Sequence, residues 1–587
     1  MVTSLPMTEP ASAPVVARQR PAFDPILWLV APAALFLLSL FIYPFLYGLV
    51  LSFQPRSGGW LANYLKFFST ENLWRTIFTT LDLALPATLV NVGLALPIAY
   101  KLRVKSRYQR WVTTILVVPI ALGTVLIAEG MLTYFGPRGW LAQTLSALHL
   151  YDGTIRLTHN YWGVLISLAI SGFPFVFLLM LSYISGIDPG LARAAATLGA
   201  SPWQQFRRIY LPLVVPGLSI AFCLAFVQAF SVFPSAVLLG APAGPTRVIS
   251  IAAYEAAFER YDYSMASSIA MIMGFTQLAI VGVVFGARRL FYRGPVVLGG
   301  AMASSGAAPH DPAWYERAWS AVVAVVVSFF LLNIALMCLT VLVNSLGTRW
   351  LGSWLPDSWT SNWYFEAWKE FALGDVLWVT IKVVLAVVFL SILIGVPAAY
   401  ALARKDFVGK RPLMLLFLLP LMVPPITYGI PLATVMYRAH LAGTINGVIL
   451  SNLIPALPFV ILVMVPFIEQ IDPRLEAAAR VLGASTRSVF WHILTPLLAP
   501  GILAASLLVM VRTIAMFELT FLTAGSDSQT LVVALYYAVF AAGVRASQSV
   551  DAMAMVYMTF TLVWLLVALQ FVNPTQLVSR VREAPRE

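Results

Sequence analysis

The sequence predicts an all-α membrane protein with about twelve transmembrane helices, arranged as two parallel six-helix repeats. The first observation is composition: of 587 residues, 60% are hydrophobic and 11% are charged, and the mean hydropathy is +0.85. Soluble domains are far less apolar, and here the apolar residues come in long runs. The second observation is an ungapped internal repeat that begins at Ile187 and again at Ile471. A repeat of this length indicates a duplicated unit.

The runs that are long enough to cross a bilayer, which takes roughly 20 residues, fall into two sets of six. In the first half they lie at about 26–53, 77–100, 111–135, 162–184, 213–239 and 265–291. In the second half they lie at about 317–343, 377–402, 412–437, 446–468, 498–523 and 551–571. We therefore expect two membrane domains, 26–293 and 314–573, joined by a flexible Gly/Ala/Ser-rich linker at 294–313. Residues 1–25 are expected to form a disordered tail and residues 574–587 a second tail.

Lysine and arginine concentrate in alternate short loops, which predicts the orientation of the chain. Examples are Arg207 and Arg208 in the first repeated loop, and Arg404 and Lys405 after the second span of the second half. Such loops face the cytoplasm. Both termini and both repeated loops are therefore predicted to be cytoplasmic. Because six spans precede the second half, the two halves enter the membrane in the same sense.

Each repeated loop has the chemistry of two short helices between membrane spans. Asp188 and Asp472 each precede a proline, and Asp-Pro starts a helix because aspartate can cap it and proline is tolerated at the first position. An alanine-rich helix follows and is interrupted at Gly199 or Gly483, each followed by alanine and serine. Small residues at such a bend let another surface approach the backbone closely.

This pattern resembles the EAA loop of the permease subunits of type I ATP-binding cassette (ABC) importers. In that family E-A-A, three residues, glycine, nine residues and I-x-L-P form a coupling helix that sits in a groove of the ATPase. The positions predicted to couple to the ATPase are Arg193, Ala194, Ala195, Gly199, Ala200, Ser201, Ile209 and Pro212 in the first copy, and Glu476, Ala478, Ala479, Gly483, Ala484, Ser485, Ile493 and Pro496 in the second. The sequence departs from the pattern at the glutamate, which is Arg193 in one copy and Ala477 in the other, where Glu476 stands one place early.

The resemblance implies a transport subunit rather than an enzyme. The sequence contains no G-x-x-x-x-G-K-[ST] loop to hold a nucleotide, so ATP hydrolysis is expected from a separate subunit. Two coupling loops imply that this chain docks two copies of that ATPase. The resemblance also implies a periplasmic solute-binding protein as partner and the bacterial inner membrane as location.

No cofactor, metal site or nucleic-acid partner is expected. The five histidines are scattered without metal-ligand spacing, and both cysteines lie in apolar runs. The net charge of +12 is distributed as expected for a chain oriented in a bilayer.

Ionisable residues inside spans are candidates for the translocation path, because burying them in a bilayer is costly. Asp82 and Lys382 occupy equivalent places in the second span of each half. They are predicted to form an ion pair or a pore-lining pair across the halves, and the alternative is that both extend to the membrane interface. The further path candidates are Glu129 in the third span and Gln228, Arg512 and Glu518 in the fifth. For these the alternative is an interhelical hydrogen bond that holds the bundle together.

An acidic, tyrosine-rich segment separates the fifth and sixth spans of the first half only. Its carboxylates, Glu255, Glu259 and Asp262, are candidates for docking a binding protein or for attracting a cationic solute. The alternative is a solvated loop helix.

The halves resemble most closely permeases for polyamines such as spermidine and putrescine, and next those for ferric iron, thiamine or phosphonates. The carboxylates Asp82, Glu129 and Glu518 favour a cation, whereas Lys382 and Arg512 oppose one. The alternative class is a secondary transporter driven by an ion gradient, which would carry G-x-x-x-D-R loops that this chain lacks after its second spans. A membrane-embedded enzyme would need clustered catalytic residues. Neither class explains the duplicated loop.

Overall fold

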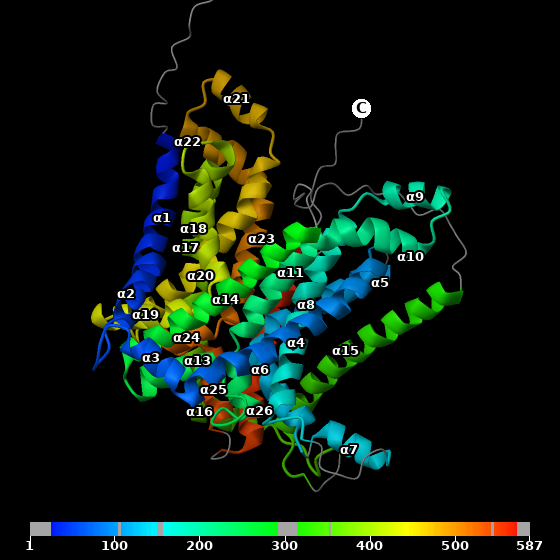
Figure 1. Ribbon diagram of the computed structural model, residues 1–587, viewed down its shortest axis with the longest axis vertical. Coiled ribbons are helices and arrows are strands. Elements are labelled where there is room, and N and C mark those ends of the chain that lie inside the picture. Colours follow the sequence, from blue (N-terminus) through cyan, green and yellow to red (C-terminus); the bar gives the residue numbers. More distant parts are fainter. Residues whose placement is uncertain are drawn as a thin grey trace, which may run out of the picture.

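Twelve apolar segments cross the bundle, as the sequence predicts (Figure 1). The computed structural model describes residues 25–103, 107–137, 139–149, 156–291, 314–350, 354–541 and 545–571. Within these ranges eleven helices are long and apolar enough to span a membrane, and one bent helix pair, Lys410–Met422 with Pro425–Arg438, is long and apolar enough when its two helices are taken together. The predicted linker, the C-terminal tail and all but the last residue of the N-terminal tail lie outside the described residues.

The first half begins with a span of four joined segments and ends with the long helix α14. Its elements are η1 (Pro25–Val30), α1 (Ala31–Leu37), η2 (Leu38–Ile42), α2 (Tyr43–Ser52), α3 (Ala62–Ser69), α4 (Glu71–Lys101), α5 (Arg107–Ile115), α6 (Val117–Phe135), α7 (Trp140–Ala147), α8 (Tyr161–Ser185), α9 (Pro189–Thr197), α10 (Pro202–Gln205), η3 (Phe206–Tyr210), α11 (Leu211–Phe230), α12 (Pro234–Leu238), α13 (Ile249–Tyr254), η4 (Glu255–Glu259) and α14 (Tyr263–Phe291).

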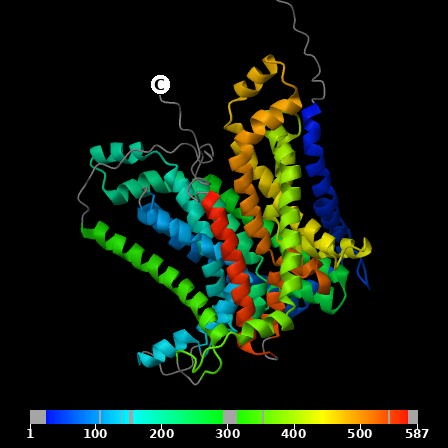
Figure 2. The ribbon, with the colours of Figure 1, turned by 180° about the vertical axis from the view of Figure 1, so that it is seen from behind.

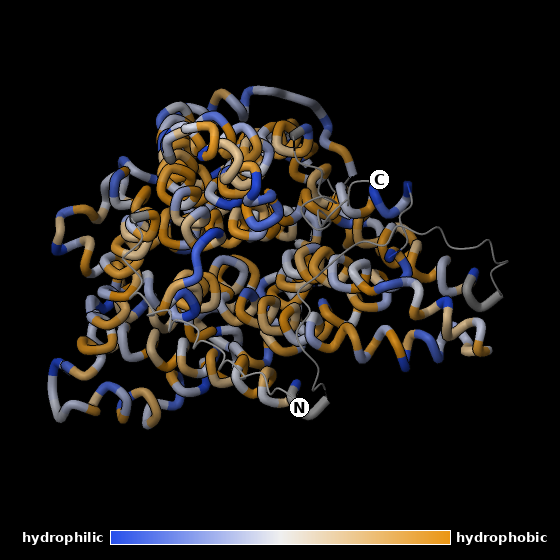
Figure 3. Tube along the Cα trace, turned by 90° about the horizontal axis from the view of Figure 1, so that it is seen from above, coloured by the Kyte–Doolittle hydropathy of each residue, from blue (hydrophilic) through white to orange (hydrophobic). Residues whose placement is uncertain are grey.

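The second half repeats this order. Its elements are α15 (Trp314–Leu346), α16 (Asn362–Glu370), α17 (Leu373–Arg404), α18 (Lys410–Met422), α19 (Pro425–Arg438), α20 (Ile445–Glu469), α21 (Pro473–Val481), α22 (Thr486–Val489), η5 (Phe490–Leu494), α23 (Thr495–Ile514), α24 (Glu518–Thr523), η6 (Ser526–Ser528), α25 (Leu531–Phe540) and α26 (Ser547–Phe571). Seen from the end where α9 and α21 lie, hydrophobic residues dominate the helices of both halves (Figure 3).

Both third spans are interrupted, although the sequence predicted continuous helices at 111–135 and 412–437. In the first half Gly123 adopts φ +72° inside α6. In the second half α18 and α19 meet at an angle of 95°, with Val423 and Pro424 between them. Glycine tolerates a positive φ, and proline kinks or breaks a helix because it lacks the N–H donor and its ring clashes with the preceding turn. Hydropathy alone does not reveal such a break.

The fifth spans are also shorter than predicted. They end at Phe230 and Ile514, and the next residues turn before a short helix begins at Pro234 or Glu518. The prediction that Glu518 lies within the fifth span was therefore wrong. As the first residue of α24, its carboxylate lies at the positive end of a helix dipole, which favours negative charge.

The first span of each half packs on the other half. Val30, Leu37 and Phe41 of the first span are buried in one hydrophobic cluster with α17 and α20 of the second half. In return α15 contacts α6, and its Val323 and Val327 are buried with α4, α8 and α11. Figure 1 shows α1 beside α17, and Figure 2 shows α15 running diagonally along the opposite side. The two halves are thus interlocked by an exchange of helices.

Candidate functional site

The two repeated loops form the predicted pairs of short helices. The Asp188 carboxylate accepts a hydrogen bond from the Gly190 amide at 2.7 Å, and Asp472 accepts one from the Arg474 amide at 2.9 Å. These contacts cap α9 and α21 and confirm the predicted helix starts. Gly199 and Gly483 follow with φ of +82° and +86°.

The bends at these glycines present an apolar surface to solvent. Leu198 is 88% exposed and Leu482 is 87% exposed, and both directly precede the glycine. No atom of the chain lies within 4 Å of a Cβ built at Gly199 or Gly483. Sequence reasoning missed the two leucines, although an apolar residue before the glycine of a polar loop in both copies was the available signal. Two matching apolar projections with free space around them fit the groove of another protein.

Most of the predicted coupling residues share this exposure. The fully buried ones are Glu476 and Ala479, and the half-buried ones are Ala195, Ala200, Ile209, Ala484 and Ile493.

The second short helix of each loop continues into the fifth span. One turn of π-helix joins α10 to α11, and another joins α22 to α23. The continuous helices therefore run from Pro202 to Phe230 and from Arg487 to Ile514. Single π-turns occur frequently at functional sites. A displacement of either loop would be transmitted along the fifth span of its half, because one unbroken helix joins the loop to that span.

Glu476 ties α21 to the end of α17. Its carboxylate accepts a hydrogen bond from Arg404 Nε at 2.8 Å and from the Tyr400 hydroxyl at 2.7 Å, and Arg404 also donates to the Ile471 carbonyl at 2.9 Å. The Arg404 and Glu476 side chains are only 10% and 9% exposed. Glu476 thus faces Arg404 and Tyr400 of its own chain, and its predicted role in coupling to the ATPase stays a prediction.

The corresponding place in the first half is built differently. The repeat sets Ala192 on Glu476, so no carboxylate is present there. The Arg103 guanidinium instead lies over the rings of Tyr100 and Tyr210, at 3.9 Å and 5.1 Å from their centroids. Cation–π contacts replace a buried ion pair on this side.

Gln228 and Arg512 remain exposed near the ends of the fifth spans, at equivalent positions of the two halves. The Arg512 guanidinium lies 5.3 Å from the ring centroid of Phe459 on α20. Glu518 and the buried Tyr428 of α19 are its charge neighbours. The structure therefore brings Arg512 and Glu518 together across the break between α23 and α24.

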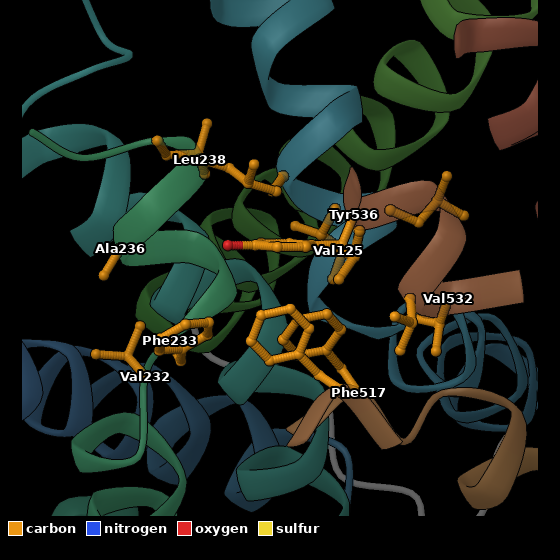
Figure 4. Close-up of a cluster of buried hydrophobic side chains, with 14 of the residues drawn as sticks. Val125, Val232, Phe233, Ala236, Leu238, Phe517, Val532 and Tyr536 are labelled. Carbon is orange, nitrogen blue, oxygen red and sulfur yellow. The ribbon is translucent and has the colours of Figure 1, made fainter. Parts of the chain in front are cut away.

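An aromatic cluster fills the interface between the halves just beyond these polar groups (Figure 4). The rings of Phe233 and Phe517 stack with their centroids 6.2 Å apart, and the ring centroids of Phe517 and Tyr536 are 4.8 Å apart. The ring centroid of Phe521 lies 5.5 Å from that of Phe233 and 5.2 Å from that of Tyr254. Burial raises the pKa of Tyr254 to about 12, so its hydroxyl is neutral. The aromatic rings of the two halves thus contact one another and close the interface at the height of Phe233 and Phe517.

The structure does not bring Asp82 and Lys382 together, and their pairing across the halves stays a prediction. No ion pair joins them in the part of the chain that the structure describes. Both are exposed, and Lys382 Nζ lies 5.1 Å from the ring centroid of Trp378 one turn earlier. Asp82 shares its helix face with the exposed Phe78. Charged groups beside exposed aromatic rings on outer helix faces fit the alternative of extension to the interface.

Glu129 does not face an accessible path either. It is buried on α6 and hydrogen-bonded to Asp551 of α26, which the sequence analysis did not single out. This is the geometry of the interhelical hydrogen bond given as its alternative. Asp551 was available as a signal, since it is an acidic residue at the start of the last apolar run.

Two of the three acidic residues between the fifth and sixth spans are engaged within the chain. Glu255 forms an ion pair with Arg247. Asp262 caps α14, because its Oδ1 accepts a hydrogen bond from the Met265 amide at 3.0 Å. The same oxygen lies 3.8 Å from Nε of Arg56. Glu259 remains exposed, so it alone of the three is free of such an engagement in the described residues.

A bundle of twelve spans with two matching loops for an external partner defines a membrane transport subunit. The chain belongs to the family of binding-protein-dependent transport system inner membrane components, which are permeases of type I ABC importers. The family match covers residues 91–349 and 391–582, so the permease domain occurs twice. In this family ATP is hydrolysed by separate subunits, and the permease is a multi-pass protein of the inner membrane.

Related permeases are named for different solutes. The chain is 28% identical over 215 residues to the probable sulfate transport system permease protein cysT of Prototheca wickerhamii, covering 36% of this chain and 82% of the relative. It is 25% identical over 413 residues to the ferric transport system permease protein FbpB of Actinobacillus pleuropneumoniae, covering 68% of this chain and 56% of the relative. It is 27% identical over 207 residues to the spermidine/putrescine transport system permease protein PotB of Haemophilus influenzae, covering 34% of this chain and 72% of the relative. The family is thus common to these proteins and the solute is not.

Proposed function

We propose that this single chain forms the whole membrane pathway of an ABC importer. It receives a small solute from a periplasmic binding protein and releases it into the cytoplasm, and two copies of an ATPase subunit drive the cycle. Both termini and both coupling loops face the cytoplasm in this proposal.

The pair of coupling loops is the observation that carries the proposal. Leu198 and Leu482 project from equivalent bends, and the positive φ at Gly199 and Gly483 turns the chain sharply beside them. Because each loop continues into a fifth span, closure of two ATPases would draw both fifth spans together. Rigid-body movement of this kind exchanges access between the two sides of a membrane.

The basic residues support the orientation. Arg207 and Arg208 lie in the first coupling loop, just before Ile209, and Arg404 anchors the second. Positive charge concentrates on cytoplasmic loops. The cluster around Phe233 and Phe517 then closes the pathway on the far side of Gln228 and Arg512, so the described conformation is closed toward the periplasm.

For the solute we propose a polyamine, and an anionic solute is the second candidate. Polyamine transport is supported by the resemblance of the halves and by the relative PotB, with Glu518 as the carboxylate nearest the pathway. The exposed guanidinium of Arg512 favours the second candidate, because arginine binds oxyanions through paired hydrogen bonds.

Purification from native membranes tests the importer class. The expected result is an ATPase subunit at about two copies per chain, and uptake into reconstituted vesicles that requires ATP and a binding protein. Recovery of the chain alone, with uptake driven by an ion gradient and indifferent to ATP, would favour the secondary transporter.

Two matched substitutions separate the solute candidates. In ATP-driven uptake, Glu518→Gln should weaken transport of spermidine while Arg512→Gln should not, if the solute is a polyamine. The opposite pattern, with sulfate or phosphate as the transported probe, would establish the anionic candidate. Lys382→Gln is the control, since Lys382 lies over Trp378 on an exposed face.

A further inference from the structure

Three helices from the two halves meet around a pair of acidic side chains. Glu129 comes from α6 of the first half, and Asp551 comes from α26 of the second. The third helix, α15, contributes Asn344 and contacts both of the others. Glu129 is 5% exposed and Asp551 is fully buried, so the pair is shielded from water.

The contacts of this pair require a proton. The two carboxyl groups lie within hydrogen-bonding range of each other, and the Asn344 amide donates to Oδ2 of Asp551. Oδ1 of Asp551 has no amide or hydroxyl donor in the described residues. Ionised carboxylates only accept hydrogen bonds, so one of the two groups must be protonated to donate to the other.

Basic side chains do not compensate the pair. No lysine or arginine lies within ion-pair distance of Glu129 or Asp551 in the part of the chain that the structure describes. On the neighbouring α16, Glu370 pairs with Arg545 at 3.2 Å instead. The helices packed against the pair also carry phenols and a thiol, which are neutral at physiological pH: Tyr134, Tyr536, Tyr557 and Cys338. Arg512 of α23 is a further titratable group, and its charge neighbours are Tyr428 and Glu518.

The pair is present on one side of the molecule only. The alignment that sets Gly217 on Gly501 sets Ser267 of α14 on Asp551. Ser267 is buried at the matching contact of α14 with α19, and no carboxylate stands there. The acidic pair is therefore not required by the shared architecture of the halves.

We propose that Glu129 and Asp551 form a proton-binding site between the two halves, in which a single shared proton holds α6 against α26. Loss of the proton places two carboxylates in contact in a water-excluded interface, where like charges repel strongly. The two helices then separate, or one carboxylate must reach water. Proton release and the packing of the halves are thereby coupled, independently of which solute the chain transports.

Infrared spectroscopy of the full chain in lipid nanodiscs tests the site directly. At pH 7 the wild-type spectrum should contain the C=O band of a protonated carboxyl group, and this band should shift in heavy water. The double variant Glu129→Gln/Asp551→Asn should lack the band. The two amide side chains of this variant can hydrogen-bond to each other, and neither carries a titratable proton. Glu476→Gln is the control, because Glu476 is ion-paired with Arg404, and this variant should keep the band. Identical wild-type and double-variant spectra in this region would overturn the proposal.

Thermal unfolding against pH gives a second measurement. The folded pair retains a proton that two separate carboxyls of the unfolded chain have released, so stability is present at low pH and declines as pH rises through the titration of the pair. The ratio of folded to unfolded chain should fall by up to about tenfold per pH unit in that range, and the double variant should lack this component. Equal pH profiles for both proteins would also contradict the site.

Discussion

Phe233 and Phe517 occupy equivalent positions in the two halves, and their rings stack with centroids 6.2 Å apart. The alignment that sets Gly217 on Gly501 sets one phenylalanine on the other, so their contact lies at the pseudo-twofold axis. Any movement that opens the interface at this level must part the two rings. Offset aromatic pairs add about 0.5–1.5 kcal/mol beyond the burial of their area, so this contact favours the closed conformation.

Replacing both rings should open this closure. We expect the double variant Phe233→Ala/Phe517→Ala to leak solute through reconstituted vesicles without ATP, because Phe-to-Ala changes in a core cost about 3–5 kcal/mol each and leave a cavity. Solute efflux from loaded vesicles measures the leak. Phe78→Ala, on an exposed helix face, is the control. An equally tight double variant would show that the cluster does not close the path.

Breaking the contact between α21 and α17 should uncouple ATP hydrolysis from transport. Glu476→Ala leaves Arg404 buried without its carboxylate, and loss of one partner of a buried pair costs about 3–5 kcal/mol. We expect the solute-stimulated part of the ATPase rate to fall while the chain still binds ATPase subunits. Recovery in the exchanged pair Glu476→Arg/Arg404→Glu would support a positioning role. Unchanged stimulation in Glu476→Ala would contradict it, and Glu469→Ala at an exposed site provides the baseline.

A bulky residue at either coupling glycine should prevent docking at that half alone. A left-handed conformation costs a residue with a side chain roughly 1–2 kcal/mol, and the added side chain would occupy the space beside Leu198 or Leu482. The ATPase copies recovered per chain should fall from two to one in Gly199→Leu or Gly483→Leu. Gly409→Leu is closely matched, because Gly409 has φ +99° and open space but lies outside both loops. Equal loss in Gly409→Leu would assign the effect to backbone strain.

Lys382 and Asp82 should be dispensable for transport. Lys382→Gln removes a cation–π contact worth about 0.5–1 kcal/mol at an exposed site, and Asp82→Asn removes a charge from an exposed face. We expect uptake rates within twofold of wild type for both. Strong loss in each single variant, restored by exchanging the two charges, would instead show that the residues meet during the transport cycle.

Local signals in the sequence predicted the helices and the bends of the two repeated loops. Asp188 and Asp472 cap helices as expected, and both loop glycines adopt the positive φ that glycine tolerates. Span number followed from hydropathy because the bilayer sets a minimum length. These features depend on residues a few positions apart, which periodicity and short motifs record.

Features that depend on distant residues were not predictable in this way. Glu129 has its partner in the last span, and Glu476 has its partner at the end of α17. Hydropathy identifies a span but not its neighbour, so the exchange of first spans was also missed. The broken third spans were missed for another reason, since Gly123 and Pro424 stand inside long apolar runs.

The exchange of first spans has a consequence for biosynthesis. Until the ribosome has made α15, the surface formed by α4, α8 and α6 lacks its partner, and the first span lacks its partner until α17 is made. The first half therefore passes through the insertion machinery with an uncovered flank and an unplaced helix. Folding of the chain is completed only when both halves are in the bilayer, so a truncated product would expose these surfaces to membrane proteases.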